Sequence, residues 1–202
     1  MKLFTFVIVA LMISGIAMAA EVPTSAGDKA LVFMFSGLDD LHLDGYMGDY
    51  GLGLRYYIAD GTAIRAGFEF GSTSLDDKEI DMEGDSTSYG LMAMYEKHME
   101  SACASVVPYW GLGAGYSSWS NKLTADSDWV EMRESGFGFI GALGFEWGFT
   151  NCMTLGGEYE LGLWKYTGET ESDIGGTTNT FNEYEGSFMG VGTASVYLSV
   201  YW

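Results

Sequence analysis

The sequence predicts an all-β fold of eight antiparallel strands, connected in up-and-down order and closed into a barrel that spans a membrane. Three observations carry this prediction. Apolar and polar residues alternate in eight separate runs, the period of a strand with two different faces. The connections are alternately long and short, and the charges within the runs share a face with the glycines. A lipid-facing Arg or Lys near the midplane costs roughly 2–4 kcal/mol, so this sorting is expected of a membrane barrel.

Composition and charge narrow the class of protein. The 202 residues include 29 Gly, 2 Pro, 6 Trp, 13 Tyr and 12 Phe, but only 9 Lys and Arg. One all-β domain fits this composition better than two soluble domains. The net charge of -19 leaves no basic face for phosphate contacts, so nucleic acid is excluded as a partner.

The first residues have the form of a secretory signal peptide. Met1 and Lys2 precede an apolar run that ends at Ile16, and small residues follow up to Ala19. No later stretch is apolar enough for a membrane helix, so a membrane would be crossed by strands. The predicted division is a signal peptide at 1–19, a polar lead at 20–28 and the barrel domain at 29–202.

The first half of the barrel domain contains four of the runs. After Asp49, leucine and tyrosine alternate with glycine and arginine, and the Asp60-Gly61 pair that follows is a strong hairpin signal. The polar segment 72–87 is predicted to be a long acidic outer loop. The predicted strands are 29–38, 50–58, 64–71 and 89–96.

The second half contains the other four runs. Pro108 lacks a ladder donor and is therefore placed near the start of its strand. The segments 118–134 and 166–185 are predicted to be outer loops, and 148–152 a tight turn. The predicted strands are 106–116, 136–147, 153–163 and 186–202.

Aromatic residues are frequent at the strand ends, where membrane barrels carry interfacial girdles. The predicted girdles are Tyr56, Trp110, Trp147, Phe149 and Trp202 on the turn side, and Phe70, Tyr116, Trp119, Trp164 and Tyr184 on the loop side.

A soluble ligand barrel with an apolar interior is the alternative fold. The glycines argue against it, because the glycine-rich face is also the charged face. Glycines such as Gly51, Gly53, Gly111 and Gly138 suit a crowded interior better than a solvated exterior.

Taken together, these features resemble the small outer-membrane β-barrel superfamily, which includes the OmpA transmembrane domain, OmpX and the opacity-type proteins. The resemblance implies a monomer in the bacterial outer membrane, surrounded by lipid and lipopolysaccharide, with both chain ends in the periplasm. It also implies that the last strand carries the signal for the barrel-assembly machinery. That signal maps onto Val196, Leu198, Val200 and Trp202, where the Trp departs from the usual terminal Phe.

The charges on the glycine face predict an interior cluster. Arg55 and Arg65 flank the predicted hairpin turn on adjacent strands, and Glu146 and Glu158 lie at a similar height on strands across the barrel. Unpaired buried charges cost several kcal/mol each, so we expect these four to form ion pairs. The cluster would be completed by Glu69, Glu96 or Glu160.

The two cysteines, Cys103 and Cys152, fall in two periplasmic turns. The oxidising compartment favours a disulfide between them, but two strands separate the turns, so two unpaired thiols are equally compatible with the sequence.

The sequence contains little that indicates catalysis. Some members of the superfamily modify lipid A with an outer-surface His, and His42 lies among aspartates in the first outer loop, where a solvated loop histidine is the simpler interpretation. His98 is placed in a periplasmic turn. The acidic run 77–85 lacks the glycine of a calcium loop, so neither a metal nor a cofactor is predicted.

The function that follows is a structural or surface-interaction role for a barrel that presents acidic outer loops. A narrow pore for small solutes, similar to OmpW, is the alternative, and a lipid A-modifying enzyme comes third.

Overall fold

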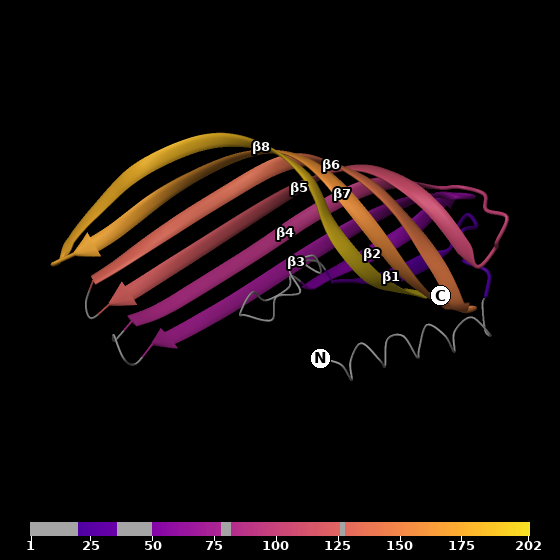
Figure 1. Ribbon diagram of the computed structural model, residues 1–202, viewed down its shortest axis with the longest axis horizontal. Coiled ribbons are helices and arrows are strands. Elements are labelled where there is room, and N and C mark those ends of the chain that lie inside the picture. Colours follow the sequence, from indigo (N-terminus) through magenta and orange to yellow (C-terminus); the bar gives the residue numbers. More distant parts are fainter. Residues whose placement is uncertain (1–19, 36–49, 78–81, 126–127) are drawn as a thin grey trace.

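The computed structural model describes residues 20–35, 50–77, 82–125 and 128–202, which form a closed antiparallel barrel (Figure 1). Each strand pairs with the next along the chain, and β1 pairs with β8 to close the ring. The strands are β1 Lys29–Phe35, β2 Tyr50–Ala59, β3 Thr62–Asp77, β4 Met82–His98, β5 Val106–Ala125, β6 Asp128–Thr150, β7 Met153–Ile174 and β8 Thr177–Tyr201. No helix in these ranges is long and apolar enough to cross a membrane. The predicted fold class is confirmed, while the predicted signal peptide lies outside the described residues.

Strands β3 to β8 are longer than the sequence predicted, and the three predicted outer loops at 72–87, 118–134 and 166–185 are wrong. β1 is described as far as Phe35, so the last residues of the predicted strand 29–38 lie outside the described residues. β3 and β4 pair as far as Asp77 and Met82, and β5 and β6 as far as Ala125 and Asp128. β7 and β8 pair up to a turn at Gly175 and Gly176, both with positive φ. These segments have no continuous apolar face, yet their residues still form backbone ladders, which one register shift between β7 and β8 at Gly168/Thr170 interrupts.

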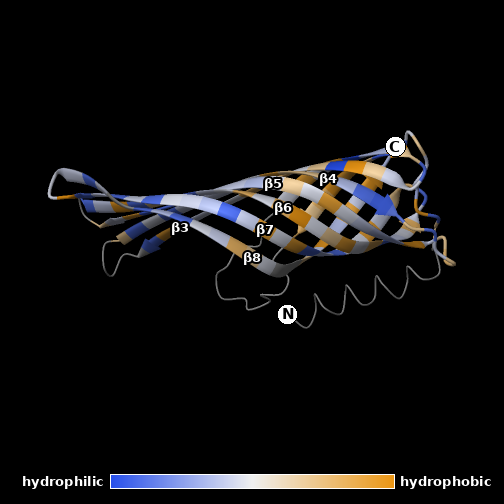
Figure 2. Cartoon of the chain, turned by 90° about the horizontal axis from the view of Figure 1, so that it is seen from above, coloured by the Kyte–Doolittle hydropathy of each residue, from blue (hydrophilic) through white to orange (hydrophobic). Residues whose placement is uncertain are grey.

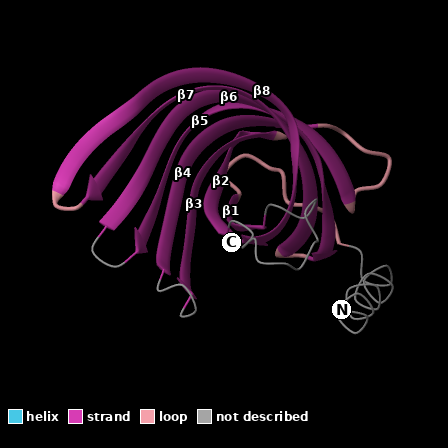
Figure 3. Cartoon of the chain, turned by 60° about the vertical axis from the view of Figure 1, so that its left-hand side comes forward, coloured by secondary structure: helices cyan, strands magenta, loops and turns pink. Residues whose placement is uncertain are grey.

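The far halves of β3 to β8 therefore form a curved sheet beyond the barrel, which we call the protruding sheet (Figures 1 and 3). In the described residues β1 and β2 do not take part in it, because their pairing ends at Phe35 and Tyr50. Figure 2 shows that hydrophobic residues are concentrated in the barrel half, and that the protruding sheet is mainly hydrophilic.

The outer face of the barrel half is apolar and exposed. Leu54, Leu112 and Phe139 are 58%, 62% and 64% exposed, whereas Arg55 and Arg65 are buried inside. A soluble protein would not expose so large an apolar band, but lipid would cover it. The predicted sorting of apolar and charged faces is thus the arrangement in the structure.

Large side chains fill the space above several inward-facing glycines. A Cβ atom placed on Gly144 would lie 2.5 Å from the ring of Tyr109, and one on Gly138 would overlap the indole of Trp164. Trp164 also packs beside the buried cluster of Met94, Ile140 and Ala142, so its prediction as a membrane-girdle residue is wrong. The glycine face is a crowded interior, in which Gly144 and Gly138 make room for large rings and Gly111 makes room for the Met94 side chain.

The lead at residues 20–28 crosses the turn-side end of the barrel. Its backbone N–H at Ala20 donates to Gly148 O at 2.9 Å, and that at Val22 donates to Ala104 O at 3.2 Å. Thr24 O accepts from the Gly61 N–H at 2.8 Å. These contacts join the lead to the end of β6 and to two different turns, so it lies across this end of the lumen.

Candidate functional site

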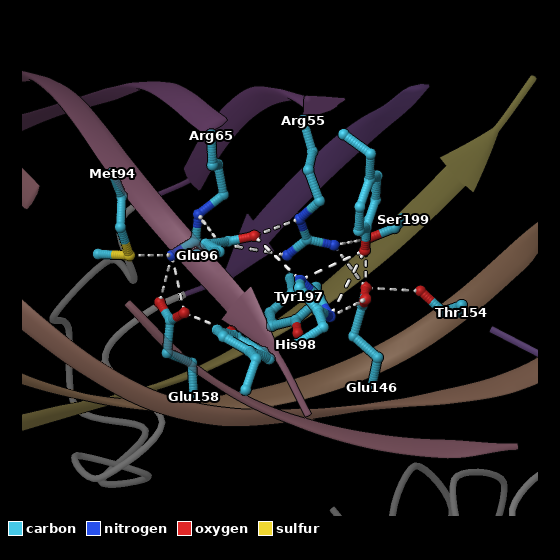
Figure 4. Close-up of polar contacts among 12 residues, drawn as sticks. Arg55, Arg65, Met94, Glu96, His98, Glu146, Thr154, Glu158, Tyr197 and Ser199 are labelled. Atoms are coloured by element: carbon cyan, nitrogen blue, oxygen red, sulfur yellow. Dashed lines mark hydrogen bonds and ion pairs between the residues drawn. The ribbon is translucent and has the colours of Figure 1, made fainter. Parts of the chain in front are cut away.

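The most distinctive group of side chains is a buried ion-pair cluster in the turn-side half of the lumen (Figure 4). Arg55 on β2 and Arg65 on β3 are direct cross-strand partners, 1% and 0% exposed. Two neighbouring guanidinium groups repel each other and have lost their hydration, so they require carboxylates within contact distance.

Glu96 on β4 lies between the two arginines. Arg55 Nε donates to Glu96 Oε2 at 2.6 Å, and Arg65 Nε lies 2.9 Å from Glu96 Oε1 as an ion pair without hydrogen-bond geometry. Glu96 is fully buried. One carboxylate thus bridges both cations, which offsets their mutual repulsion.

The remaining carboxylates come from the opposite wall of the barrel. Arg55 Nη1 donates to Glu146 Oε1 of β6 at 2.6 Å, and Arg65 Nη2 donates to both Glu158 oxygens of β7 at 2.7 Å. The structure therefore brings together Arg55, Arg65, Glu146 and Glu158, with Glu96 at the centre. The ion pairs connect β2 and β3 directly to β6 and β7 across the lumen.

Hydroxyl groups surround the carboxylates. Glu146 Oε1 accepts from Thr154 Oγ1 at 2.9 Å, and Glu146 Oε2 accepts from the Tyr201 hydroxyl at 3.0 Å. Tyr109 donates a short hydrogen bond to Glu158, and the ring of Tyr197 lies 5.4 Å from the Arg55 guanidinium carbon. These contacts satisfy most of the acceptor positions that the arginines leave open.

His98 is a member of this cluster that the sequence interpretation missed. It is the last residue of β4 and 4% exposed, so its assignment to a periplasmic turn is wrong. Its Nε2 lies 3.4 Å from Glu96 Oε2, and its ring stacks on Tyr109 with centroids 5.0 Å apart. The alternation that places Glu96 inside also places His98 inside, which is the signal that could have found it.

Glu69 and Glu160, predicted to complete the cluster, lie on its outer side. Both line a cavity of about 140 Å³ together with Trp164. Glu96, which contacts both arginines, occupies the central position instead.

The disulfide that was one of the two possibilities is not formed. Cys103 and Cys152 are exposed free thiols. Cys103 Sγ lies 3.0 Å from Ser105 Oγ, and Cys152 Sγ lies 3.6 Å from Thr150 Oγ1. Strands β5 and β6 separate the two turns, and neighbouring strands are about 4.8 Å apart, so the Cα atoms exceed the roughly 7 Å limit for a bridge.

The residues of the predicted assembly signal lie on the outward-facing side of β8 and directly after its end. Val196, Leu198 and Val200 are partly exposed, and Trp202 is 67% exposed. The alternate residues Tyr197, Ser199 and Tyr201 point inward and are buried. The final strand therefore has one lipid-facing side and one side that completes the ion-pair cluster.

His42 lies outside the described residues. Within the described ranges, no group of three or more His, Cys, Asp or Glu side chains has the arrangement of a metal site.

The comparisons with known proteins agree with this architecture. Residues 6–192 match the model of the outer membrane protein β-barrel domain. A major outer membrane protein of Thermus thermophilus aligns with a TM-score of 0.56 at 12% identity, over 87% of this chain and 99% of that one. Ail, the attachment invasion locus protein of Yersinia pestis, aligns with a TM-score of 0.49 at 14% identity, over 88% and 99% of the two chains. No curated protein sequence matches the chain.

The fold and the match to the family model define a small outer-membrane barrel. The chain belongs to the outer membrane protein β-barrel family, and its location is the bacterial outer membrane.

Proposed function

We propose that this protein is a closed, monomeric outer-membrane barrel with a structural or surface-interaction role. The observation that carries the proposal is the ion-pair cluster, which crosses the lumen from Arg55 and Arg65 to Glu146 and Glu158. Because a lumen filled in this way leaves no path for solutes, it favours a role performed on the outer surfaces of the protein.

Size and packing support a closed lumen. Eight strands enclose an interior just wide enough for side chains to fill it. Here the arginines, the carboxylates and the rings of Tyr57, Tyr109 and Tyr197 are all buried, and the lead covers the turn-side end. Opening a continuous water path would require separating buried ion pairs, which costs several kcal/mol.

The surface role rests on the protruding sheet. It carries an excess of acidic side chains, and its cations Lys122, Arg133 and Lys165 are outnumbered by Asp128, Glu131, Glu134, Glu169, Glu171, Asp173, Glu183 and Glu185. In this proposal the apolar band contacts outer-membrane lipid and lipopolysaccharide, and the barrel-assembly machinery recognises the last strand during insertion.

Solute entry into proteoliposomes tests the proposal. Vesicles that contain the purified protein are placed in isotonic solutions of small sugars and amino acids, and swelling is followed by light scattering. We expect the same rate as for protein-free vesicles, with a general porin as the positive control. Swelling that rises with the amount of protein and falls with solute size would instead support the narrow pore.

A further inference from the structure

A cavity lies in the lumen on the loop side of the ion-pair cluster, and we call it the lumen cavity. It is the space of about 140 Å³ that Glu69, Glu160 and Trp164 line, together with residues of β4, β5 and β6. Its lining residues Gly67 and Glu69 follow Arg65 of the cluster along β3, towards the loop side. Both glutamates are partly exposed. The cluster fills the lumen beneath the cavity, so a ligand enters from the loop side.

Glycines keep the lumen cavity open. A Cβ atom on Gly67 would lie 3.0 Å from the Met92 side chain. One on Gly90 would lie 3.5 Å from Glu69 Oε2, so side chains at these two positions would reduce the space. A water molecule occupies about 30 Å³ in the liquid, and an apolar cavity of about 150 Å³ admits benzene. The lumen cavity therefore has room for one molecule of about six non-hydrogen atoms.

The charges around the lumen cavity favour a cation. Glu69 and Glu160 belong to β3 and β7, which lie opposite each other in the ring of strands. No Lys, Arg or His is among the described residues that line the cavity. The cluster beneath it contributes no positive excess, because its two arginines contact three carboxylates. The cavity therefore attracts a cation and repels an anion or the carboxylate of a zwitterion.

Trp164 adds an aromatic face beside the two carboxylates. Cβ atoms on Gly138 of β6 and Gly162 of β7 would overlap different parts of its indole, and one on Gly115 of β5 would lie 3.1 Å from it. The ring thus packs along a wall of glycines from three neighbouring strands, and its other face is directed into the cavity that it lines. The face of an indole attracts organic cations, quaternary ammonium ions in particular.

We infer that the lumen cavity binds a small organic cation, an alkylated ammonium ion without an acidic group. The alkyl groups of this ion pack against Met92, Ile140 and the ring of Trp164, and its charge is shared between Glu69 and Glu160. The apolar part of the lining disfavours a strongly hydrated metal ion. In agreement, the described residues contain no group of three or more His, Cys, Asp or Glu arranged as a metal site.

Tetramethylammonium chloride is the probe, because its cation is a compact alkylated ammonium ion. Two molecules of similar size serve as controls: tert-butanol lacks the charge, and glycine betaine adds a carboxylate. The protein is folded in an uncharged detergent, and binding is measured by ligand-observed NMR, with protein-free micelles as the blank. We expect saturable binding of tetramethylammonium and no binding of either control. Equal binding of tert-butanol or betaine would contradict the selection by charge.

Two variants with the same chemical change locate the site. Glu160→Gln keeps the shape of the side chain and removes one of the two charges of the cavity, so it should weaken tetramethylammonium binding roughly 5-fold or more. Glu83→Gln is the matched control, because Glu83 is exposed in the protruding part of β4 and does not line the cavity. It should leave the affinity unchanged. Equal effects of the two changes would overturn the assignment to the lumen cavity.

Gly90→Ala tests the space of the cavity without changing a charge. The nearest neighbours of its Cβ would lie at 3.5 to 3.8 Å, so the barrel should fold normally while the methyl group occupies part of the cavity. Tetramethylammonium affinity should fall roughly 2-fold or more, and an unchanged affinity rejects the site.

This inference rests on the closed lumen of the proposed function, and the two can fail separately. If tetramethylammonium does not bind and vesicles that contain the protein do not swell in its chloride solution, the ligand site alone is rejected. Swelling in that solution rejects the closed lumen on which the site rests.

Discussion

Replacing Arg55 by Met tests the energetic role of the ion-pair cluster. Arg55 forms ion pairs of 2.6 Å with both Glu96 and Glu146, and all three side chains are buried. The change leaves both carboxylates buried, Glu96 with Arg65 as its remaining arginine and Glu146 without an arginine partner among the described residues. Removing one partner of a buried ion pair costs about 3–5 kcal/mol, so we expect a loss of unfolding free energy in this range.

Arg133→Met is the matched control, because it removes the same kind of side chain from a salt bridge in the protruding sheet. The Arg133 side chain is 49% exposed, and it contacts Glu131 at 2.8 Å. Exposed ion pairs contribute about 0.2–1 kcal/mol, so this variant should lose less than about 1 kcal/mol.

Urea unfolding of the folded barrel in detergent, followed by tryptophan fluorescence, measures both variants. Urea slopes of about 1–3 kcal/mol per M predict that R55M lowers the midpoint by more than about 1 M, and that R133M lowers it less. Adding Glu146→Gln to R55M should recover part of the loss, because it removes one uncompensated charge. Equal urea midpoints for R55M and R133M would refute the argument that the buried ion pairs contribute more to the stability of the barrel than the exposed one.

Three further predictions concern other parts of the chain. Gly144→Ala should destabilise the barrel by about 1–3 kcal/mol in the same assay, because its Cβ meets the Tyr109 ring at 2.5 Å, whereas Gly141→Ala has only one neighbour within 4 Å, at 3.9 Å, and should be tolerated. Hydrogen bonds from Arg133 lower the pKa of Glu131 in the protruding sheet, so Arg133→Ala should raise that pKa in an NMR titration. The stability that Glu131 contributes is therefore complete above its unfolded pKa and is lost as the pH falls through its folded pKa. Hydrogen bonds to Cys103 lower the pKa of its thiol, so at pH 7 maleimide should label Cys103 faster in the folded than in the urea-unfolded chain, as read by mass spectrometry.

Each of these outcomes can be contradicted directly. Equal stabilities of the two glycine variants would show that the ring can move aside. An unchanged pKa of Glu131 without Arg133 would show that their contact does not persist in solution, and equal labelling of folded and unfolded Cys103 would remove the case for a lowered thiol pKa.

The sequence was sufficient to predict which side chains of the strands point into the barrel, but not how long the strands are. Alternation placed Arg55, Arg65, Glu146 and Glu158 inside, and the short Asp60-Gly61 turn placed the two arginines beside each other. The protruding sheet was missed because both of its faces are polar, so the segments that form it lack the apolar period by which the other strands were recognised. These segments are strands because their backbones pair with neighbouring strands, and such pairing leaves no pattern of polar and apolar side chains in the sequence.

The membership of the ion-pair cluster was also predicted only in part. His98 was assigned to a turn because strand ends are not marked by alternation, and its burial depends on rings contributed by other strands, such as that of Tyr109. The choice among Glu69, Glu96 and Glu160 needed the height of each strand relative to its neighbours. Only the three-dimensional register places Glu96 between both arginines.

Single-channel recording in planar lipid bilayers tests the central claim, a lumen closed by the ion-pair cluster, most directly. The unmodified protein should show no regular conductance steps under an applied voltage. The Arg55→Ala and Arg65→Ala double variant should either conduct or fold less stably, because the cluster has lost both cations. Regular ion-conducting steps from the unmodified protein would contradict the closed lumen and identify the barrel as a pore.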